Sequence, residues 1–146
     1  DKQPVSYYQA DYLSKSIARA VKKDKVTHIL GLARGGLVPA TIISYKLKVP
    51  LLSYAVSRYE DTTKTNELKV VQDVNFSSLA KGSKLLVVDD VCDSGDTIKF
   101  IKKQIKKVDG ITAIYSTLFT KKKTKRLLDH YGVVVSSDTW IDFPWE

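Results

Sequence analysis

The stretch that decides the fold is Lys84–Thr97, KLLVVDDVCDSGDT. Four consecutive apolar residues, Leu85–Val88, are typical of a strand that is buried on both faces of a parallel sheet. Two carboxylates, Asp89 and Asp90, follow at the end of this predicted strand. Polar residues then lead into a predicted helix over residues 97–108, whose isoleucines repeat at intervals of three and four. The stretch therefore predicts a strand, a turn and a helix.

Short apolar runs and amphipathic stretches alternate on both sides of it. They predict strands at residues 26–32, 51–56, 67–72, 111–119 and 133–135, helices at residues 8–22, 39–47 and 123–131, and a loop at residues 57–66. This order indicates an α/β domain with a mostly parallel central sheet flanked by helices. A chain of 146 residues fits one domain, so we assign residues 1–146 to it. In such a fold the site lies beyond the carboxyl ends of the strands.

The composition excludes several classes of protein. With 43% hydrophobic and 27% charged residues, the chain is neither disordered nor fibrous. Its single cysteine, Cys92, excludes a disulfide framework and a zinc site with several thiolates, and it predicts a reducing, cytoplasmic compartment. No apolar run approaches the roughly 20 residues that a membrane helix needs, so we expect no membrane partner.

The net charge of +8 suits nucleic acid and small polyphosphates equally well. Two stretches, residues 99–107 and 121–126, contain only basic charges and account for the whole excess. The rest of the chain is slightly acidic. We interpret most of these lysines as solvated faces that add a long-range attraction for a polyanionic ligand.

The turn at residues 93–97, DSGDT, predicts a cradle for a phosphate. A helix that begins here offers unpaired backbone N–H groups and partial positive charge, Gly95 permits a tight turn, and Ser94 and Thr97 add hydroxyls. Asp89 and Asp90 would repel a phosphate, but they suit sugar hydroxyls or a Mg²⁺ ion that bridges to phosphates. Together these groups describe a pocket for a phosphorylated ribose.

A second glycine-rich loop follows the strand predicted at residues 26–32. Residues 31–39 read GLARGGLVP, in which Arg34 offers a planar fork of donors for phosphate oxygens. Gly35 and Gly36 allow the backbone to approach a ligand closely. The two loops together contain four of the seven glycines of the chain.

The string VVDDVCDSGDT resembles the phosphoribosyl pyrophosphate (PRPP) motif of type I phosphoribosyltransferases. GLARGG resembles their pyrophosphate loop, in which the peptide bond between the Arg and Gly positions is often cis. The resemblance implies that PRPP contacts Arg34, Gly35, Asp89, Asp90, Asp93, Ser94, Gly95, Asp96 and Thr97. It also implies Mg²⁺ as the cofactor, with Asp89 and Asp90 as the metal site.

Two later segments, STLFTK ending at Lys121 and DTWIDFPWE beginning at Asp138, resemble the purine-binding segments of small bacterial xanthine-guanine phosphoribosyltransferases. The resemblance implies base contacts from Lys121, Trp140 and Ile141, within a small hood formed by the C-terminal segment. A lysine only donates hydrogen bonds, so it favours a carbonyl and selects 6-oxopurines over adenine. Trp140 offers a flat face for stacking.

The polar loop at residues 57–66 resembles the flexible flap that covers the site in this family. The resemblance assigns four residues to that flap, namely Ser57, Arg58, Tyr59 and Lys69. The family has adjacent Ser and Tyr residues, whereas Arg58 separates them here. Bacterial members often carry an arginine before ELKV, where this chain has Asn66. At these positions the chain departs from the family pattern for contacting pyrophosphate from the flap.

These features predict a purine phosphoribosyltransferase that joins PRPP to guanine, xanthine or hypoxanthine, giving a nucleoside monophosphate and pyrophosphate. The resemblance implies catalytic roles for Arg34, Asp89, Asp90 and Asp93, with Asp93 as general base at purine N7. It also implies a homodimer or homotetramer without a nucleic-acid partner. Two alternatives stay open. One is a PRPP- or nucleotide-binding regulator of the same fold that binds nucleic acid, and the other is an enzyme for adenine or a pyrimidine.

Overall fold

The computed structural model describes residues 1–58 and 67–146. In chain order the elements are β1 (Lys2–Pro4), α1 (Tyr7–Val21), β2 (His28–Ala33), α2 (Leu37–Leu47), β3 (Leu51–Arg58), β4 (Leu68–Gln72), β5 (Lys84–Cys92), α3 (Asp96–Lys106), β6 (Thr112–Lys121), β7 (His130–Val135) and β8 (Trp140–Asp142). Short 3₁₀ helices lie at Lys22–Asp24, Phe76–Ser78 and Lys125–Leu127. In this part of the chain, no helix has the length and apolar character needed to cross a membrane.

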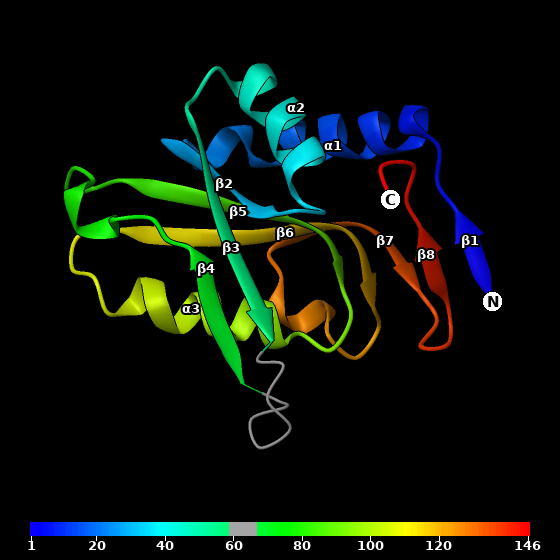
Figure 1. Cartoon of the computed structure of the whole chain (residues 1–146). Coiled ribbons are helices and arrows are strands. Elements are labelled where there is room, and N and C mark those ends of the chain that lie inside the picture. The colour runs from blue at the N-terminus through cyan, green and yellow to red at the C-terminus, as the bar shows by residue number, and fades with distance from the viewer. Residues whose placement is uncertain (59–66) are drawn as a thin grey trace.

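A six-stranded sheet in the order β4-β3-β2-β5-β6-β7 forms the centre of the molecule. Its neighbouring strands are parallel, except that β3 and β4 are antiparallel. Helices α1 and α2 cover one face of the sheet and α3 covers the other (Figure 1). The α/β class with a mostly parallel central sheet flanked by helices is therefore confirmed.

The core follows the sequence pattern that predicted it. All four apolar residues of Leu85–Val88 are completely buried, with 0% exposure. Leu86 and Val88 pack among residues of α1 and α2, whereas Leu85 and Val87 pack among residues of α3. The central strand β5 therefore supplies both halves of the core, as the run of apolar residues predicted.

The strand order reverses between β2 and β5. From β2 the chain passes through α2 to β3 on one side, and from β5 it passes through α3 to β6 on the other. In open α/β sheets this reversal leaves a crevice beyond the carboxyl ends of the two strands, where ligands bind. The two glycine-rich loops follow β2 and β5, so the topology places both of them at this crevice.

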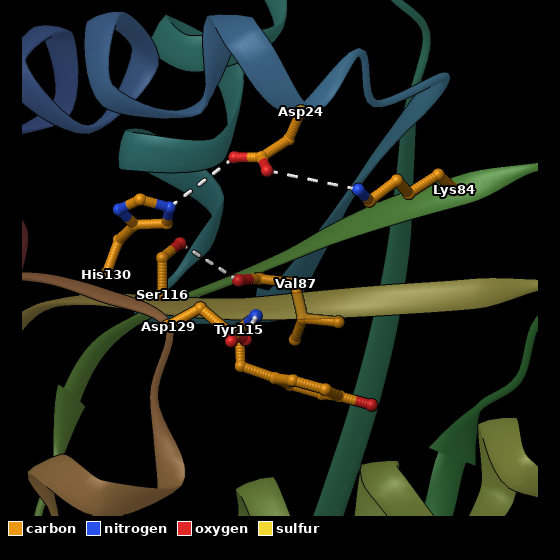
Figure 2. Close-up of polar contacts among 7 residues, drawn as sticks. All are labelled: Asp24, Lys84, Val87, Tyr115, Ser116, Asp129 and His130. Carbon is orange, nitrogen blue, oxygen red and sulfur yellow. Dashed lines mark hydrogen bonds and ion pairs between the residues drawn. The ribbon is translucent and has the colours of Figure 1, made fainter.

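The opposite end of the sheet, where β5 and β7 begin, is joined by charged side chains. The Asp24 carboxylate lies between two basic side chains, with Oδ1 3.9 Å from Nζ of Lys84 and Oδ2 3.6 Å from Nε2 of His130 (Figure 2). Nearby, the buried hydroxyl of Ser116 donates to the carbonyl of Val87 over 3.0 Å (Figure 2). The Asp24 contacts thus connect the amino ends of β5 and β7, and the Ser116 hydrogen bond joins the middle of β6 to that of β5.

The structure differs from the predicted elements in three places. The helix predicted at residues 123–131 is a 3₁₀ turn followed by the start of β7, because β7 pairs with β6 from His130 onward. Ser57 and Arg58 belong to β3 and not to a loop, because they pair with β4. The sequence also gave no sign of β1 and β8, which form a two-stranded parallel sheet of their own.

Candidate active site

The turn between β5 and α3 forms a small polar pocket of about 120 Å³. Gly95 adopts the left-handed conformation there, with a φ of 84°, and its carbonyl accepts the N–H of Lys99 as α3 begins. The hydroxyl of Ser94 accepts the N–H of Asp96 over 3.3 Å. The pocket is lined by Asp89 and by residues 91–98. The structure thus brings together the residues assigned to the phosphate cradle.

Asp89 and Asp90 stand side by side at the end of β5. Oδ1 of Asp89 accepts the N–H of Asp90 over 2.8 Å, and Oδ1 of Asp90 accepts the N–H of Val91 over 2.7 Å. Burial, together with the neighbouring charge of Asp90, raises the pKa of Asp89 well above its ordinary value. Burial also raises the pKa of Asp90. Such a pair is poised to receive a cation or hydroxyl donors.

The loop after β2 packs directly against this end of β5. A Cβ on Gly36 would lie 2.4 Å from the carbonyl oxygen of Val88 and 2.9 Å from the Cα of Asp89. A Cβ on Gly35 would meet the carboxylate of Asp90. Close backbone contact thus requires glycine at position 36, and a side chain at position 35 would have to displace Asp90. The cis peptide bond joins Ala33 to Arg34, one position before the bond that the family resemblance implied.

A larger pocket of about 630 Å³ lies between this loop and the end of the chain. Arg34, Gly35 and Asp90 line it together with Val38, Trp145 and Glu146. Sequence reasoning missed Glu146, whose negative charge contributes to the raised pKa of Asp90. It also left Trp145 without a functional role. Both residues lie in segment 138–146, whose resemblance pointed to the base and not to the pocket beside Arg34.

The third pocket, of about 80 Å³, contains the residues assigned to the base. Its lining consists of Asp90, Val91, Asp93, Lys121, Thr139, Trp140, Ile141, Phe143 and Glu146. Asp90 is shared with the pocket beside Arg34, and Asp93 is shared with the phosphate cradle. The three pockets are therefore neighbours along one crevice, joined by the two aspartates.

Lys121 is the last residue of β6, and it is buried with only 3% exposure. Its ammonium group donates to the backbone carbonyls of Ser136, Ser137 and Thr139, at 3.0 Å for Ser136 and 3.4 Å for Ser137. An ammonium group carries three donors, so these carbonyls can satisfy all of them. Lys121 thus holds the segment before β8 in place while it lines the base pocket.

The side chains of β8 face in different directions. Trp140 is 61% exposed, whereas Ile141 is buried in the core. β8 is held by β1, which pairs Lys2 with Trp140 and Gln3 with Ile141. The exposed indole of Trp140 therefore stands at the pocket on a strand that the first residues of the chain fix.

The predicted flap is described only in part. Ser57 lies opposite Lys69 in the β3–β4 pair, and Arg58 lies opposite Leu68. Nη2 of Arg58 is 2.9 Å from Oδ2 of Asp96, which connects β3 to the phosphate cradle. Tyr59, which was also assigned to the flap, lies outside the described residues.

Comparison with known proteins agrees with this geometry. Residues 2–146 match the phosphoribosyl transferase domain family. The chain is 33% identical over 144 residues to the xanthine-guanine phosphoribosyltransferase of Idiomarina loihiensis, covering 97% of this chain and 85% of that protein. It is 31% identical over 145 residues to the enzyme of the same name from Nitratidesulfovibrio vulgaris, covering 98% and 83%.

Solved structures give the same result. A purine phosphoribosyltransferase from Pyrococcus horikoshii superposes with a TM-score of 0.89 at 28% identity, covering 99% of this chain and 94% of that one. A hypothetical protein from Neisseria gonorrhoeae, solved with bound ppGpp, superposes with a TM-score of 0.85 at 25% identity, covering 100% and 89%. With its two loops at the crevice between β2 and β5, the chain belongs to the phosphoribosyl transferase domain family.

Proposed function

We propose that this protein is a purine-salvage phosphoribosyltransferase that transfers the 5-phosphoribosyl group of PRPP to a 6-oxopurine. The observation that carries the proposal is the arrangement of the three pockets. Asp93 lines both the cradle and the base pocket, and Asp90 lines both the base pocket and the pocket beside Arg34. A phosphorylated sugar seated between them would present its anomeric carbon to both a base and a pyrophosphate group.

The reaction assigns a task to each group. A nitrogen of the base forms a bond to C1 of the ribose while the bond from C1 to the pyrophosphate oxygen breaks, and the base loses a proton. Backbone amides and hydroxyls at residues 93–97 hold the 5′-phosphate. Asp89 and Asp90 hold the ribose hydroxyls, Asp93 accepts the proton at N7, and Arg34 stabilises the charge that develops on pyrophosphate.

The carboxylate pair fits Mg²⁺. This ion is usually held by one or two carboxylates together with substrate phosphates, and not by a cage of protein ligands alone. Within residues 1–58 and 67–146, no cluster of three or more His, Cys, Asp or Glu side chains forms such a cage. Asp89 and Asp90 would therefore hold the ion jointly with PRPP, and the bound ion would neutralise charge on the leaving pyrophosphate.

Lys121 supports the choice of a 6-oxopurine. Its ammonium group lines the base pocket and carries no acceptor, so it can contact a carbonyl at position 6 but not the amino group of adenine. To do so it must share or release one of its three backbone partners. The xanthine-guanine specificity of the relatives supports the same substrate class.

We also propose that the protein is a homodimer or homotetramer. Helix α2 supports self-association, because its outer face has an apolar character that a solvated helix seldom has. Val38 and Ile42 are only half-buried there, and Tyr45 is exposed. Sedimentation of the purified chain measures the mass, and a monomer at micromolar concentration would contradict this point.

An activity panel tests the main proposal. The purified chain is incubated with PRPP, Mg²⁺ and each of guanine, xanthine, hypoxanthine, adenine and uracil, and the nucleoside monophosphate is measured. We expect product with at least one 6-oxopurine and none in EDTA. Asp109 follows the end of α3 that lies away from the cradle, so Asp109→Asn is the matched control for the variants Asp89→Asn and Asp93→Asn. The proposal fails if no 6-oxopurine gives product.

The alternative function is that of a PRPP- or nucleotide-binding regulator that binds nucleic acid. A groove of about 560 Å³ at the ends of α1 and α2 is lined by five basic side chains, Arg19, Lys22, Lys25, Lys46 and Lys48. Filter binding of RNA and DNA at several salt concentrations measures any such affinity. We expect only weak, sequence-independent binding. The cytoplasmic location stays a prediction from the single cysteine of the sequence.

A further inference from the structure

The phosphate cradle contains a group that opposes its proposed ligand. Asp96, the first residue of α3, lines the pocket beside Asp89 and Asp93, and no lysine or arginine is among the described residues that line it. A phosphate monoester carries close to two negative charges at neutral pH. Backbone amides at the start of a helix attract it, but the Asp96 carboxylate repels it from within the same turn.

Arg58 counters this charge from another element. It is the last residue of β3, and its Nη2 donates to Oδ2 of Asp96 over 2.9 Å. This hydrogen bond, followed by the Arg58 charge and smaller contributions from Ser94 and Lys99, lowers the pKa of Asp96 below its ordinary value. Asp96 is therefore ionised at neutral pH, and its negative charge is balanced by Arg58 at the end of β3.

The ion pair of Arg58 and Asp96 is exposed to solvent beside the cradle. The side chains of Arg58 and Asp96 are 45% and 48% exposed. Exposed ion pairs contribute about 0–1 kcal/mol to stability, so folding alone gives little reason for this arrangement. A planar guanidinium can contact a carboxylate and a phosphate at the same time, and it binds phosphate oxygens with a geometry that a lysine cannot reproduce.

We propose that Arg58 and Asp96 form a binding pair for the 5′-phosphate of PRPP. Asp96 holds the guanidinium of Arg58 at the cradle, and Arg58 supplies the positive charge that lets a cradle containing a carboxylate accept a phosphate. This inference rests on the proposed function. It adds Arg58, on β3, as a phosphate ligand beside the amides and hydroxyls of residues 93–97.

A double-mutant cycle tests the pair. PRPP binding is measured by calorimetry with Mg²⁺ and without a base, so that no turnover occurs. Arg58→Ala leaves Asp96 unopposed and removes a charged hydrogen bond, so we expect binding to weaken about 10- to 100-fold. Arg58→Lys keeps the positive charge but loses the planar fork of donors, so its PRPP affinity should lie between those of the wild type and Arg58→Ala. Asp96→Asn alone loses both the repulsion and the anchor, so it changes binding less than about threefold.

The double variant gives the decisive result. Adding Asp96→Asn to Arg58→Ala removes the unopposed carboxylate, so we expect it to recover most of the lost affinity. Arg19→Ala is the matched control, because it removes the same charge from an exposed arginine in the last turn of α1. It should bind PRPP within twofold of the wild type. Thermal melts confirm that each variant is folded.

The outcomes separate this inference from the proposed function. If the wild type binds PRPP and Arg58→Ala binds it within twofold, the pair has no role in phosphate binding and the inference fails alone. It also fails if Asp96→Asn recovers nothing in the Arg58→Ala background. A folded wild-type chain that binds no PRPP overturns both proposals at once.

Discussion

The carboxylate of Asp90 occupies the space into which a side chain at Gly35 would grow. A Cβ on Gly35 would lie 2.0 Å from Oδ2 and 2.5 Å from Cγ of Asp90. The loop after β2 and the end of β5 therefore touch through a glycine and a carboxylate, with no room between them. This contact fixes the spacing between the groups assigned to pyrophosphate and to ribose.

Gly35→Ala should consequently lower stability and PRPP affinity together. The backbone of Gly35 is outside the left-handed region, so the added methyl group acts only through the space it takes. Overpacking of this kind costs about 1–3 kcal/mol, and here it must displace Asp90 or the loop. Urea denaturation measures the first effect and calorimetry with PRPP the second.

The control for Gly35→Ala is its own partner. In an Asp90→Ala background the obstructing carboxylate is gone, so the same substitution should cost less than about 1 kcal/mol. An equal cost in both backgrounds would show that the contact with Asp90 is not what excludes a side chain at position 35.

Asp89→Asn should stabilise the protein without ligands while it removes activity. Burial raises the pKa of Asp89 above its ordinary value near 3.8. Between the ordinary and the raised pKa, the folded chain therefore binds more protons than the unfolded chain. Stability contributed by the protonated form is fully present below the ordinary pKa. It is lost as pH rises through the raised value. An amide needs no proton to stay neutral, so it avoids this loss.

Thermal melts from pH 4 to 8 without Mg²⁺ test this effect. The melting temperature of the wild type should fall relative to that of Asp89→Asn as pH rises, with the largest difference at the alkaline end. Asp109→Asn, at an exposed carboxyl, should run parallel to the wild type. A constant difference between wild type and Asp89→Asn at every pH would contradict the argument.

Lys121→Met should damage both the fold of the hood and the choice of base. The substitution keeps an unbranched side chain, one heavy atom shorter, but leaves the carbonyls of Ser136, Ser137 and Thr139 without their common donor. Ser136 and Ser137 are exposed residues, so water can replace part of what the ammonium group supplied, and we expect a destabilisation of about 1–3 kcal/mol. Denaturation measures it, with Lys122→Met at an exposed neighbouring position as the control.

The same variant separates structure from recognition. If Lys121 reads the 6-oxo group, kcat/KM for the 6-oxopurines falls more than the PRPP affinity does, and the preference over adenine shrinks. If PRPP affinity falls as much as kcat/KM, Lys121 acts only by holding residues 136–139.

Asp93→Asn should lower turnover and spare PRPP binding. General base catalysis contributes about 10²- to 10⁴-fold to a rate, and an amide cannot accept the proton. The N–H groups and hydroxyls of the cradle remain, so calorimetry should give a PRPP affinity close to that of the wild type. A large loss of PRPP binding with normal turnover would refute the role of Asp93 as a base.

Features that depend on neighbouring residues were predictable from sequence. The fully buried run Leu85–Val88 identified the central strand, and the spacing of Ile98, Ile101 and Ile105 identified the buried face of α3. The glycine pair and the DSGDT turn marked both loops, because each carries a pattern within a few positions. What these loops bind came from the family resemblance and not from the pattern.

Features that depend on distant partners were not predictable. Residues 123–131 have a helical pattern, but the hydroxyl of Thr124 donates to the carbonyl of Cys92, and Asp129 accepts the N–H of Tyr115. These long-range bonds accompany the pairing of β7 with β6, which overrides the local preference. Likewise, nothing in the run KKKTKR indicates that only its first lysine, Lys121, is buried.

The pairing of β1 with β8 has a consequence for the order in which the protein acquires its parts. The strand that carries Trp140 is held by residues 2–4, which are synthesised before it. During synthesis, the nascent chain can close its phosphate loops once β5 and α3 have emerged, but the base pocket needs residues 139–146. In the proposed enzyme, the pocket for the purine is therefore completed after the phosphate loops.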